Sequence, residues 1–174
     1  MSGLETAIVV VLDDARPQLE PVRAEFHAAA VANGIPLHVT LLYPFAPPNQ
    51  VDEAALADFF AQFGAFTLTL TRLATWPRVV YAVPEPREAL LAIMHALFGK
   101  YPEYPPYEGE ISEPEPHATL SELEQGESLD ETAAGIRAKA EPLFPLTCEI
   151  RDVALLEEYE PEQWRERRRF PLRA

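Results

Sequence analysis

Cysteine, lysine and long apolar runs are all scarce in this sequence of 174 residues. The single cysteine, Cys148, excludes an intramolecular disulfide and a cysteine-rich metal site, and its strand-like setting indicates a buried structural thiol. The aliphatic run from Ala7 to Leu12 is too short to cross a bilayer, which needs about 20 apolar residues. The first residues also lack the basic segment of a signal peptide, so we expect a cytoplasmic protein without a membrane partner.

Positive charge is equally sparse. The chain has 14 Lys and Arg residues against 28 Asp and Glu residues, a formal net charge of −14, and its lysines are Lys100 and Lys139. Tight non-specific binding of nucleic acid requires many Lys or Arg contacts to phosphates, and an acidic surface repels a polyanion. If the substrate is a nucleic acid, we therefore expect the protein to bind a small piece of it.

The spacing of apolar residues predicts one order of elements twice: strand, helix, strand, helix, strand. In the first copy the predicted strands are 7–12, 38–43 and 66–73, and the predicted helices are 16–32 and 51–63. In the second copy the strands are 78–83, 117–121 and 146–156, and the helices are 87–98 and 129–140. Residues 101–116, rich in proline, tyrosine and glutamate, predict a long ordered loop. We interpret 1–174 as a single bilobal domain with halves at about 5–76 and 77–160 and a C-terminal segment, 161–174.

A four-residue pattern, His-x-Thr-Leu, marks both copies. It begins at His38 and again, 79 residues later (117 − 38 = 79), at His117, in the corresponding predicted strand of each half. Side chains two residues apart on a strand point to the same face, so His38 pairs with Thr40 and His117 with Thr119. If the halves pack about a pseudo-twofold axis, the two pairs converge on one cleft.

Two imidazoles and two hydroxyls in one cleft suit phosphoryl chemistry. Attack on a phosphodiester needs a base that takes a proton from water and an acid that protonates the leaving oxygen. Histidine, with an ordinary pKa of about 6.5, can supply one neutral and one protonated copy near neutral pH, and threonine hydroxyls can donate hydrogen bonds to phosphate oxygens. No metal is required, and neither motif has the spacing of a zinc site. A lone histidine on a strand is usually structural, but two matched copies favour catalysis.

The paired motifs and the phrase from Gly34 to Phe45, GIPLHVTLLYPF, resemble the two-histidine phosphoesterase superfamily. Within it, they are most similar to the bacterial 2',5' RNA ligase-like and cyclic-phosphodiesterase branch. The resemblance implies an α+β fold, a bilobal duplication in which two antiparallel sheets face a central groove with helices outside. It also implies activity without a cofactor on 2',3'-cyclic phosphates, related cyclic nucleotides or 2',5'-linked RNA ends. The implied catalytic tetrad is His38, Thr40, His117 and Thr119.

Aromatic residues near the motif strands are candidates for substrate binding, because every nucleobase offers a π-face for stacking. Tyr43 and Phe45 leave the first motif strand towards the expected rim of the groove, and Tyr81 and Trp76 are further candidates. Packing in the core is the alternative interpretation for each of them.

Three other features carry charge or imidazole groups. His27 and His95 lie within helical patterns, and we interpret both as structural residues at the surface or in the core. The run from Arg165 to Arg169 is the one basic cluster of the sequence. It predicts either a solvated terminal segment or a lip that steers phosphate towards the groove.

The sequence thus predicts a metal-independent phosphodiesterase that hydrolyses a 2',3'-cyclic or 2',5'-linked phosphate of a nucleotide or an RNA end. Two alternatives stay open: an RNA 2',5'-end ligase, which would favour a positively charged groove, and a nucleotide-binding protein that keeps the cleft without turnover. A monomer is the expected state, with the small substrate as its partner.

Overall fold

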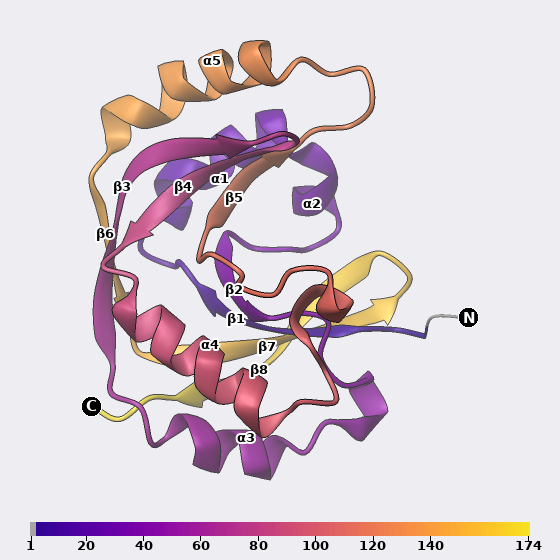
Figure 1. Cartoon of the computed structure of the whole chain (residues 1–174). Coiled ribbons are helices and arrows are strands. Elements are labelled where there is room, and N and C mark those ends of the chain that lie inside the picture. Colours follow the sequence, from indigo (N-terminus) through magenta and orange to yellow (C-terminus); the bar gives the residue numbers. More distant parts are fainter. Residues whose placement is uncertain (1–2) are drawn as a thin grey trace.

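The computed structural model describes residues 3–174, which form one curled sheet of eight antiparallel strands with helices outside it (Figure 1). The order across the sheet is β6-β3-β4-β5-β2-β1-β7-β8. The strands are β1 (Thr6–Val11), β2 (His38–Leu42), β3 (Phe66–Trp76), β4 (Val79–Glu85), β5 (Ala118–Glu122), β6 (Leu146–Ile150), β7 (Asp152–Glu160) and β8 (Gln163–Pro171). The predicted α+β class is confirmed.

The strands that carry the two motifs, β2 and β5, lie side by side at the centre of the sheet. They are joined by one registered pair, Val39 with Ala118, whereas the neighbouring strand pairs run in register over four residues or more. The two expected sheets are therefore two four-stranded halves that meet at this short seam. Because both motifs begin beside the seam, their side chains start out close together.

The two halves of the sheet do not follow the two halves of the chain. Strand β3 pairs with β4 and β6, and β7 pairs with β1, so each half of the sheet contains strands from both halves of the sequence. The connection between β3 and β4 explains part of this exchange, since Trp76 pairs with Val79 across a tight hairpin. The segment 161–174, set apart from the two halves as a C-terminal segment, supplies the edge strand β8, which pairs with β7 along its length.

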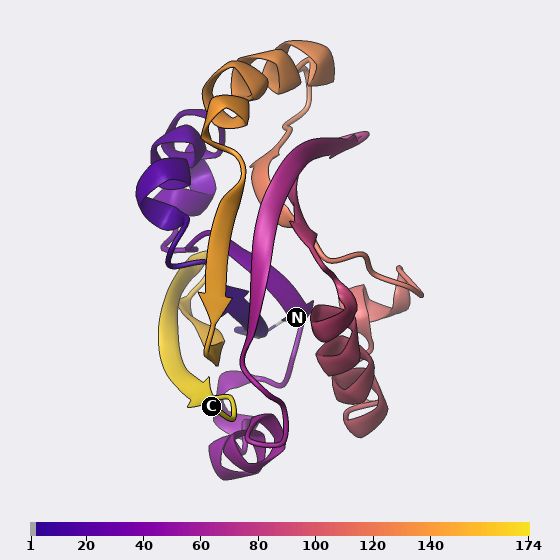
Figure 2. The same ribbon diagram turned by 90° about the vertical axis from the view of Figure 1, so that its left-hand side faces the viewer.

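Helices pack against the outer side of the sheet, α1, α2 and α5 towards one end and α3 and α4 towards the other (Figures 1 and 2). Helix α1 contacts α5 and β5, α4 contacts β2, and α3 contacts β8. No helix within residues 3–174 is both long and apolar enough to cross a membrane. The helices are α1 (Arg16–Phe26), α2 (Ala28–Ala32), α3 (Glu53–Phe60), α4 (Glu88–Lys100) and α5 (Leu129–Ala140), with short 3-10 turns at Pro48–Gln50, Pro106–Gly109 and Glu141–Leu143.

Strand β1 is buried on both faces, which explains its unbroken run of aliphatic residues. Ile8 and Val10 belong to the main core under the helices. Ala7 and Val9 point to the opposite face and join a smaller apolar cluster with Leu156 of β7. This second face is the concave one, so the groove has an apolar floor beneath its polar side chains.

Candidate active site

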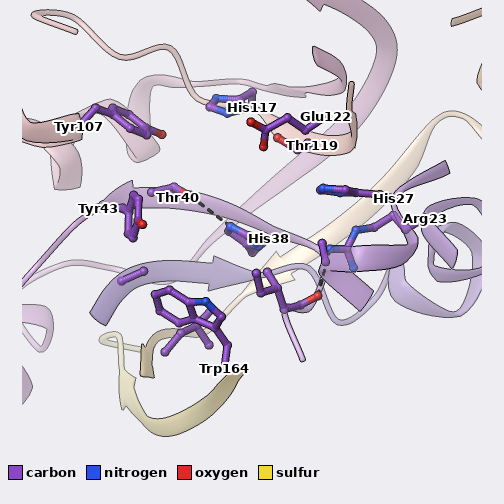
Figure 3. Close-up of a pocket in the computed structure, with 14 residues that line it drawn as sticks. Arg23, His27, His38, Thr40, Tyr43, Tyr107, His117, Thr119, Glu122 and Trp164 are labelled. Carbon is purple, nitrogen blue, oxygen red and sulfur yellow. Dashed lines mark hydrogen bonds between the residues drawn. The ribbon is translucent and has the colours of Figure 1, made fainter. Parts of the chain in front are cut away.

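The two His-Thr pairs line a single cavity of about 310 Å³ (Figure 3). His38 and Thr40 enter it from β2; on the other side of the seam Thr119 enters from β5 and His117 from the residue just before that strand. The alternation of a strand places Val39 and Ala118 on the opposite face, where both are fully buried. The structure therefore brings together all four residues that the motifs single out.

Both imidazole rings are held by a hydrogen bond to the backbone carbonyl of the residue two positions earlier. His38 Nδ1 bonds to the carbonyl oxygen of Pro36 at 2.7 Å, and His117 Nδ1 bonds to the carbonyl oxygen of Glu115 at 2.8 Å. A carbonyl can only accept, so in each ring Nδ1 carries the proton and Nε2 is the free, basic nitrogen. In His38 this Nε2 lies 3.2 Å from Thr40 Oγ1, which can donate to it.

Both histidines are neutral at neutral pH. Burial lowers the pKa of His38 to about 4. The positive charge of Arg23 lowers it further, whereas the hydrogen bond from the ring to the carbonyl of Pro36 acts in the opposite direction. Burial also lowers the pKa of His117, and the hydrogen bond to the carbonyl of Glu115 opposes that shift. Two neutral rings with free Nε2 atoms can accept protons, and a bound anion would favour protonation of either.

His117 is also held by aromatic neighbours. Its ring lies edge-on to Trp76, with 4.7 Å between centroids, and to Tyr81, with 5.7 Å between centroids. Tyr81 is the cross-strand partner of Thr119, so strand pairing fixes the position of this contact. Tyr81 does not line the cavity itself. The predicted substrate-binding candidate Tyr81 thus packs against a motif histidine instead.

Three aromatic residues form one end of the cavity. Tyr43 lies with its ring centroid 6.1 Å from that of Trp164 and 6.4 Å from that of Tyr107. The Tyr43 hydroxyl donates to Glu5 at 2.6 Å, and burial together with this carboxylate raises the pKa of Tyr43. The candidate position of Tyr43 at the cavity is therefore observed, and two partners that the sequence did not indicate join it.

Phe45 requires a correction. It is 6% exposed, does not line the cavity, and packs edge-on against Tyr101 and Tyr104 at 5.0 and 5.3 Å between centroids. Its backbone N–H donates to the carbonyl of Thr6, which holds this segment against β1. Of the two interpretations of Phe45, packing in the core is the one that the structure supports.

The opposite end of the cavity is polar and includes a residue expected to be structural. His27 interrupts the predicted helix 16–32, with φ −143° and ψ 45° between α1 and α2, and its side chain lines the cavity. Arg23 lies one turn earlier and is 1% exposed, donating to Glu20 at 2.6 Å and to the carbonyl of Ile35 at 3.0 Å. Burial lowers the pKa of His27 to about 4, and the charge of Arg23 adds to that shift. His95, by contrast, is exposed on α4 as expected.

The arginine cluster does not reach the cavity. Arg167 bonds to Glu53 at 2.8 Å and to Glu157 at 3.3 Å, and Arg169 pairs with Asp13. Arg165 and Arg168 pair with acidic residues as well. These side chains belong to strand β8 and pair with carboxylates, and Arg165 and Arg168 are exposed. Of the two interpretations, the solvated terminal segment describes them and the phosphate-steering lip does not.

No group of three or more His, Cys, Asp or Glu side chains within residues 3–174 is arranged to hold a metal ion. Cys148 is buried in the core, and burial raises its pKa to about 11, in keeping with a structural thiol.

Matched His-Thr pairs at the seam of a curled antiparallel sheet are the arrangement of a two-histidine phosphoesterase. The model of the 2'-5' RNA ligase superfamily matches residues 11–162, and the chain belongs to that superfamily. The resemblance carried by the two motifs is confirmed.

Solved structures share the fold at low sequence identity. A protein described as a phosphoesterase superposes with a TM-score of 0.63 at 19% identity, covering 99% of this chain and 100% of that one. LigT of E. coli, complexed with NADP+, superposes with a TM-score of 0.60 at 19% identity over 100% of both chains. The protein TT0787 of Thermus thermophilus gives a TM-score of 0.54 at 21% identity over 98% of both chains. No curated protein shows significant similarity to the sequence.

Proposed function

We propose that this protein is a phosphodiesterase that hydrolyses a 2',3'-cyclic or 2',5'-linked phosphate of a nucleotide or a short RNA end. The observation that carries the proposal is the pair of neutral imidazoles whose Nδ1 atoms are tied to backbone carbonyls, each with a threonine hydroxyl beside it, in one cavity. The free Nε2 of one ring can take a proton while that of the other, once protonated, can return one. Hydrolysis of a phosphodiester requires these two transfers.

His38 is the proposed base and His117 the proposed acid. The pKa of His38, about 4, leaves it neutral across the physiological range, ready to take a proton from the attacking water. His117 is held in place by Trp76 and Tyr81, and a bound phosphate would favour its protonated form against the lowering of its pKa by burial. Water then attacks phosphorus, and His117 protonates the ribose oxygen that leaves.

The threonines are the proposed ligands of the non-bridging phosphate oxygens. The hydroxyl of Thr40 lies 3.2 Å from His38 Nε2. A phosphate oxygen is a charged and therefore stronger acceptor, so substrate would draw this hydroxyl away and free Nε2 for the water. Thr119 lies in the matching position on β5 and would bind the other oxygen.

Charge favours a small substrate. The chain has a net charge of −14, and the arginines of β8 are already paired with carboxylates, so no run of free cations follows the groove within residues 3–174. A row of RNA phosphates would need such a run. The structures of E. coli LigT in complex with 3'-AMP, ATP and NADP+ support a nucleotide as ligand. Ligation, which must hold two RNA ends, is favoured less, and a mere binding protein has no need of two free Nε2 atoms.

Hydrolysis is tested with a panel of 2',3'-cyclic mononucleotides and 2',5'-linked dinucleotides, in the presence and absence of a chelator. We expect turnover of at least one of these classes, unchanged by the chelator, because proton transfer and charge stabilisation are supplied by side chains. A protein with both His38 and His117 replaced by alanine is the control for contaminating activity. Absence of turnover across the panel, or activity lost with chelator and restored by zinc or magnesium, would contradict the proposal.

The proposed roles also predict the pH dependence of kcat/KM, which reports the free enzyme. His38 must be neutral, so activity should fall as the pH drops through its pKa of about 4. His117 must be protonated, so activity should fall as the pH rises through its pKa, which burial lowers from 6.5. We therefore expect a bell-shaped profile with its optimum below pH 6.5.

Acid unfolding must be separated from this effect. Buried histidines with lowered pKa values, His27 and His38, stabilise the fold less as the pH falls below 6.5, because their protonation is then more favourable in the unfolded chain. Circular dichroism at each pH of the profile identifies the range in which the protein is folded. An optimum above neutral pH within that range would contradict the conclusion that His38 and His117 are both neutral at neutral pH.

A further inference from the structure

The polar end of the cavity takes no part in the proposed reaction. Arg23, His27 and Glu122 line it: Arg23 and His27 lie on the far side of the histidine pair from the aromatic end formed by Tyr43 and its neighbours, and Glu122 is drawn beside His117 (Figure 3). A substrate whose base lies on the aromatic rings and whose phosphate lies between the histidines would extend its leaving group towards this polar end. The hydrogen-bonding groups and charges of these three side chains therefore indicate which groups the leaving part of the substrate carries.

Two of the side chains are donors with unused capacity. A guanidinium has five N–H groups, and Glu20 and Ile35 accept from two different nitrogens of Arg23, while its Nε is buried without a partner. His27 Nδ1 is likewise buried without a partner. A buried N–H without an acceptor is costly, so the proton of the neutral His27 ring belongs on Nε2, and the ring points into the cavity.

The third side chain is an acceptor. Glu122 ends β5, the strand that carries Thr119 and begins directly after His117, and its carboxylate makes no hydrogen bond with the other residues drawn in Figure 3. A carboxylate is an acceptor only, so it matches hydroxyl or amine groups of a ligand and repels phosphate. Donors on one side and a carboxylate on the other make a site with both kinds of hydrogen-bonding group.

Charge decides between an anionic and a neutral ligand at this end. The ion pair of Arg23 with Glu20, at 2.6 Å, cancels the one positive charge, and Glu122 adds a negative one. A second phosphate here would meet no net positive charge. Two adjacent hydroxyls, which both donate and accept, satisfy the carboxylate and the donors together.

We propose that Glu122, His27 and Arg23 bind the 2',3'-diol of a second ribose, which makes the substrate a linear phosphodiester between two nucleosides rather than an isolated cyclic phosphate. This inference rests on the proposed function, since it takes the reacting phosphate to lie between His38 and His117. The first nucleoside stacks at the aromatic end, and the ribose that leaves with the 5' oxygen occupies the polar end. A 2',5'-linked dinucleotide has this layout.

The test compares a 2',5'-linked diadenosine with an analogue that lacks the 2' and 3' hydroxyls of the second sugar. We expect the wild-type protein to favour the ribose form by about tenfold or more in kcat/KM, the size of one or two hydrogen bonds to a charged group. The ratio between the two substrates should fall towards one in Glu122→Leu and in His27→Phe. Because the ratio is taken within each variant, general losses of activity cancel. Glu124→Gln, which removes a nearby exposed carboxylate that does not line the cavity, should keep the ratio.

Two outcomes would overturn the subsite. One is equal kcat/KM for the two dinucleotides in the wild-type protein, and the other is a gain when the second ribose carries a 3'-phosphate, which would indicate an anion site. Failure of the proposed hydrolysis is recognised separately. If a 2',3'-cyclic mononucleotide is cleaved and neither dinucleotide is, the phosphodiesterase proposal stands and the inference of a linear substrate is rejected. If no substrate of the panel is cleaved, calorimetry with the two dinucleotides measures binding, and a preference of about tenfold for the diol supports the subsite although the phosphodiesterase proposal fails. Equal binding would reject the subsite in that case too.

Discussion

Replacing His38 or His117 with alanine should lower kcat/KM for the preferred phosphodiester by about 100-fold or more in each case, the usual contribution of a general acid or base. Each ring presents Nε2 to the cavity because its Nδ1 is tied to a backbone carbonyl, so alanine removes the proton-transfer atom and little of the surrounding structure. The measurement is steady-state kinetics on purified variants, with thermal unfolding to show that each variant is folded.

The double variant and an unrelated histidine test whether the pair acts as a unit. Once one proton transfer is lost, removing the other costs little more, so the double variant should be far less impaired than the product of the two single losses. His95→Ala is the matched control, because His95 is exposed on α4 and lies outside the cavity. His27 is unsuitable as a control, since it lines the cavity. Full activity in His38→Ala, or multiplicative losses in the double variant, would contradict paired acid–base catalysis.

The site was predictable where it depends on local pattern. A strand places residues i and i+2 on one face, so the duplicated His-x-Thr spacing alone pairs each imidazole with a hydroxyl. The repeated order of elements placed both motifs on equivalent strands, and these strands, β2 and β5, are neighbours in the sheet. Turn-forming Asn33-Gly34 and the apolar spacing of the helices also fixed most element positions to within a few residues.

The partners of those strands were not predictable in the same way. The buried faces of strands β3 and β7 suit either half of the sheet. Which half each strand joins depends on the non-local strand pairing that is most stable, and no local sequence pattern encodes that choice. Trp164 is placed at the cavity by the pairing of β8 with β7 and by the hydrogen bond from its backbone N–H to the carbonyl of Asn33. Tyr107 is placed there by the hydrogen bond from its backbone N–H to the carbonyl of Tyr43. Neither residue lies in a periodic segment that would have indicated its position.

His27 and Arg23 illustrate the same limit within a helix. Apolar spacing predicted one helix over 16–32, and in an unbroken helix the direction of a polar side chain follows from its place in the turn. The break at His27, with φ −143°, instead places its ring at the cavity. The buried guanidinium of Arg23 donates a hydrogen bond to the backbone carbonyl of Ile35, a residue that follows the helix. A polar residue in an apparently regular helix thus became part of the site through a local break.

Replacing Gly34 with alanine should reduce the free energy of unfolding by about 3 kcal/mol, with a fall in Tm of about 10 °C for a chain of this size. Gly34 has φ +85°, in the left-handed region that costs other residues about 1–2 kcal/mol. A Cβ at this position would also lie well inside van der Waals contact of the Trp164 carbonyl oxygen, a backbone atom that cannot rotate away. Relief of that contact requires the β7–β8 hairpin to move and the bond from Trp164 to Asn33, 2.8 Å long, to break.

Gly126→Ala separates the two contributions. Gly126 has a similar φ, +93°, but a Cβ there would meet nothing within 4 Å, so this variant should show the conformational cost of about 1–2 kcal/mol alone. Urea unfolding of both variants therefore measures the contact with Trp164 by difference. Because Trp164 lines the aromatic end of the cavity, Gly34→Ala should also raise KM for a nucleotide substrate, whereas Gly126→Ala should not. Equal destabilisation in the two variants would mean that the hairpin shifts freely, and then the turn at Gly34 does not hold Trp164 in the site.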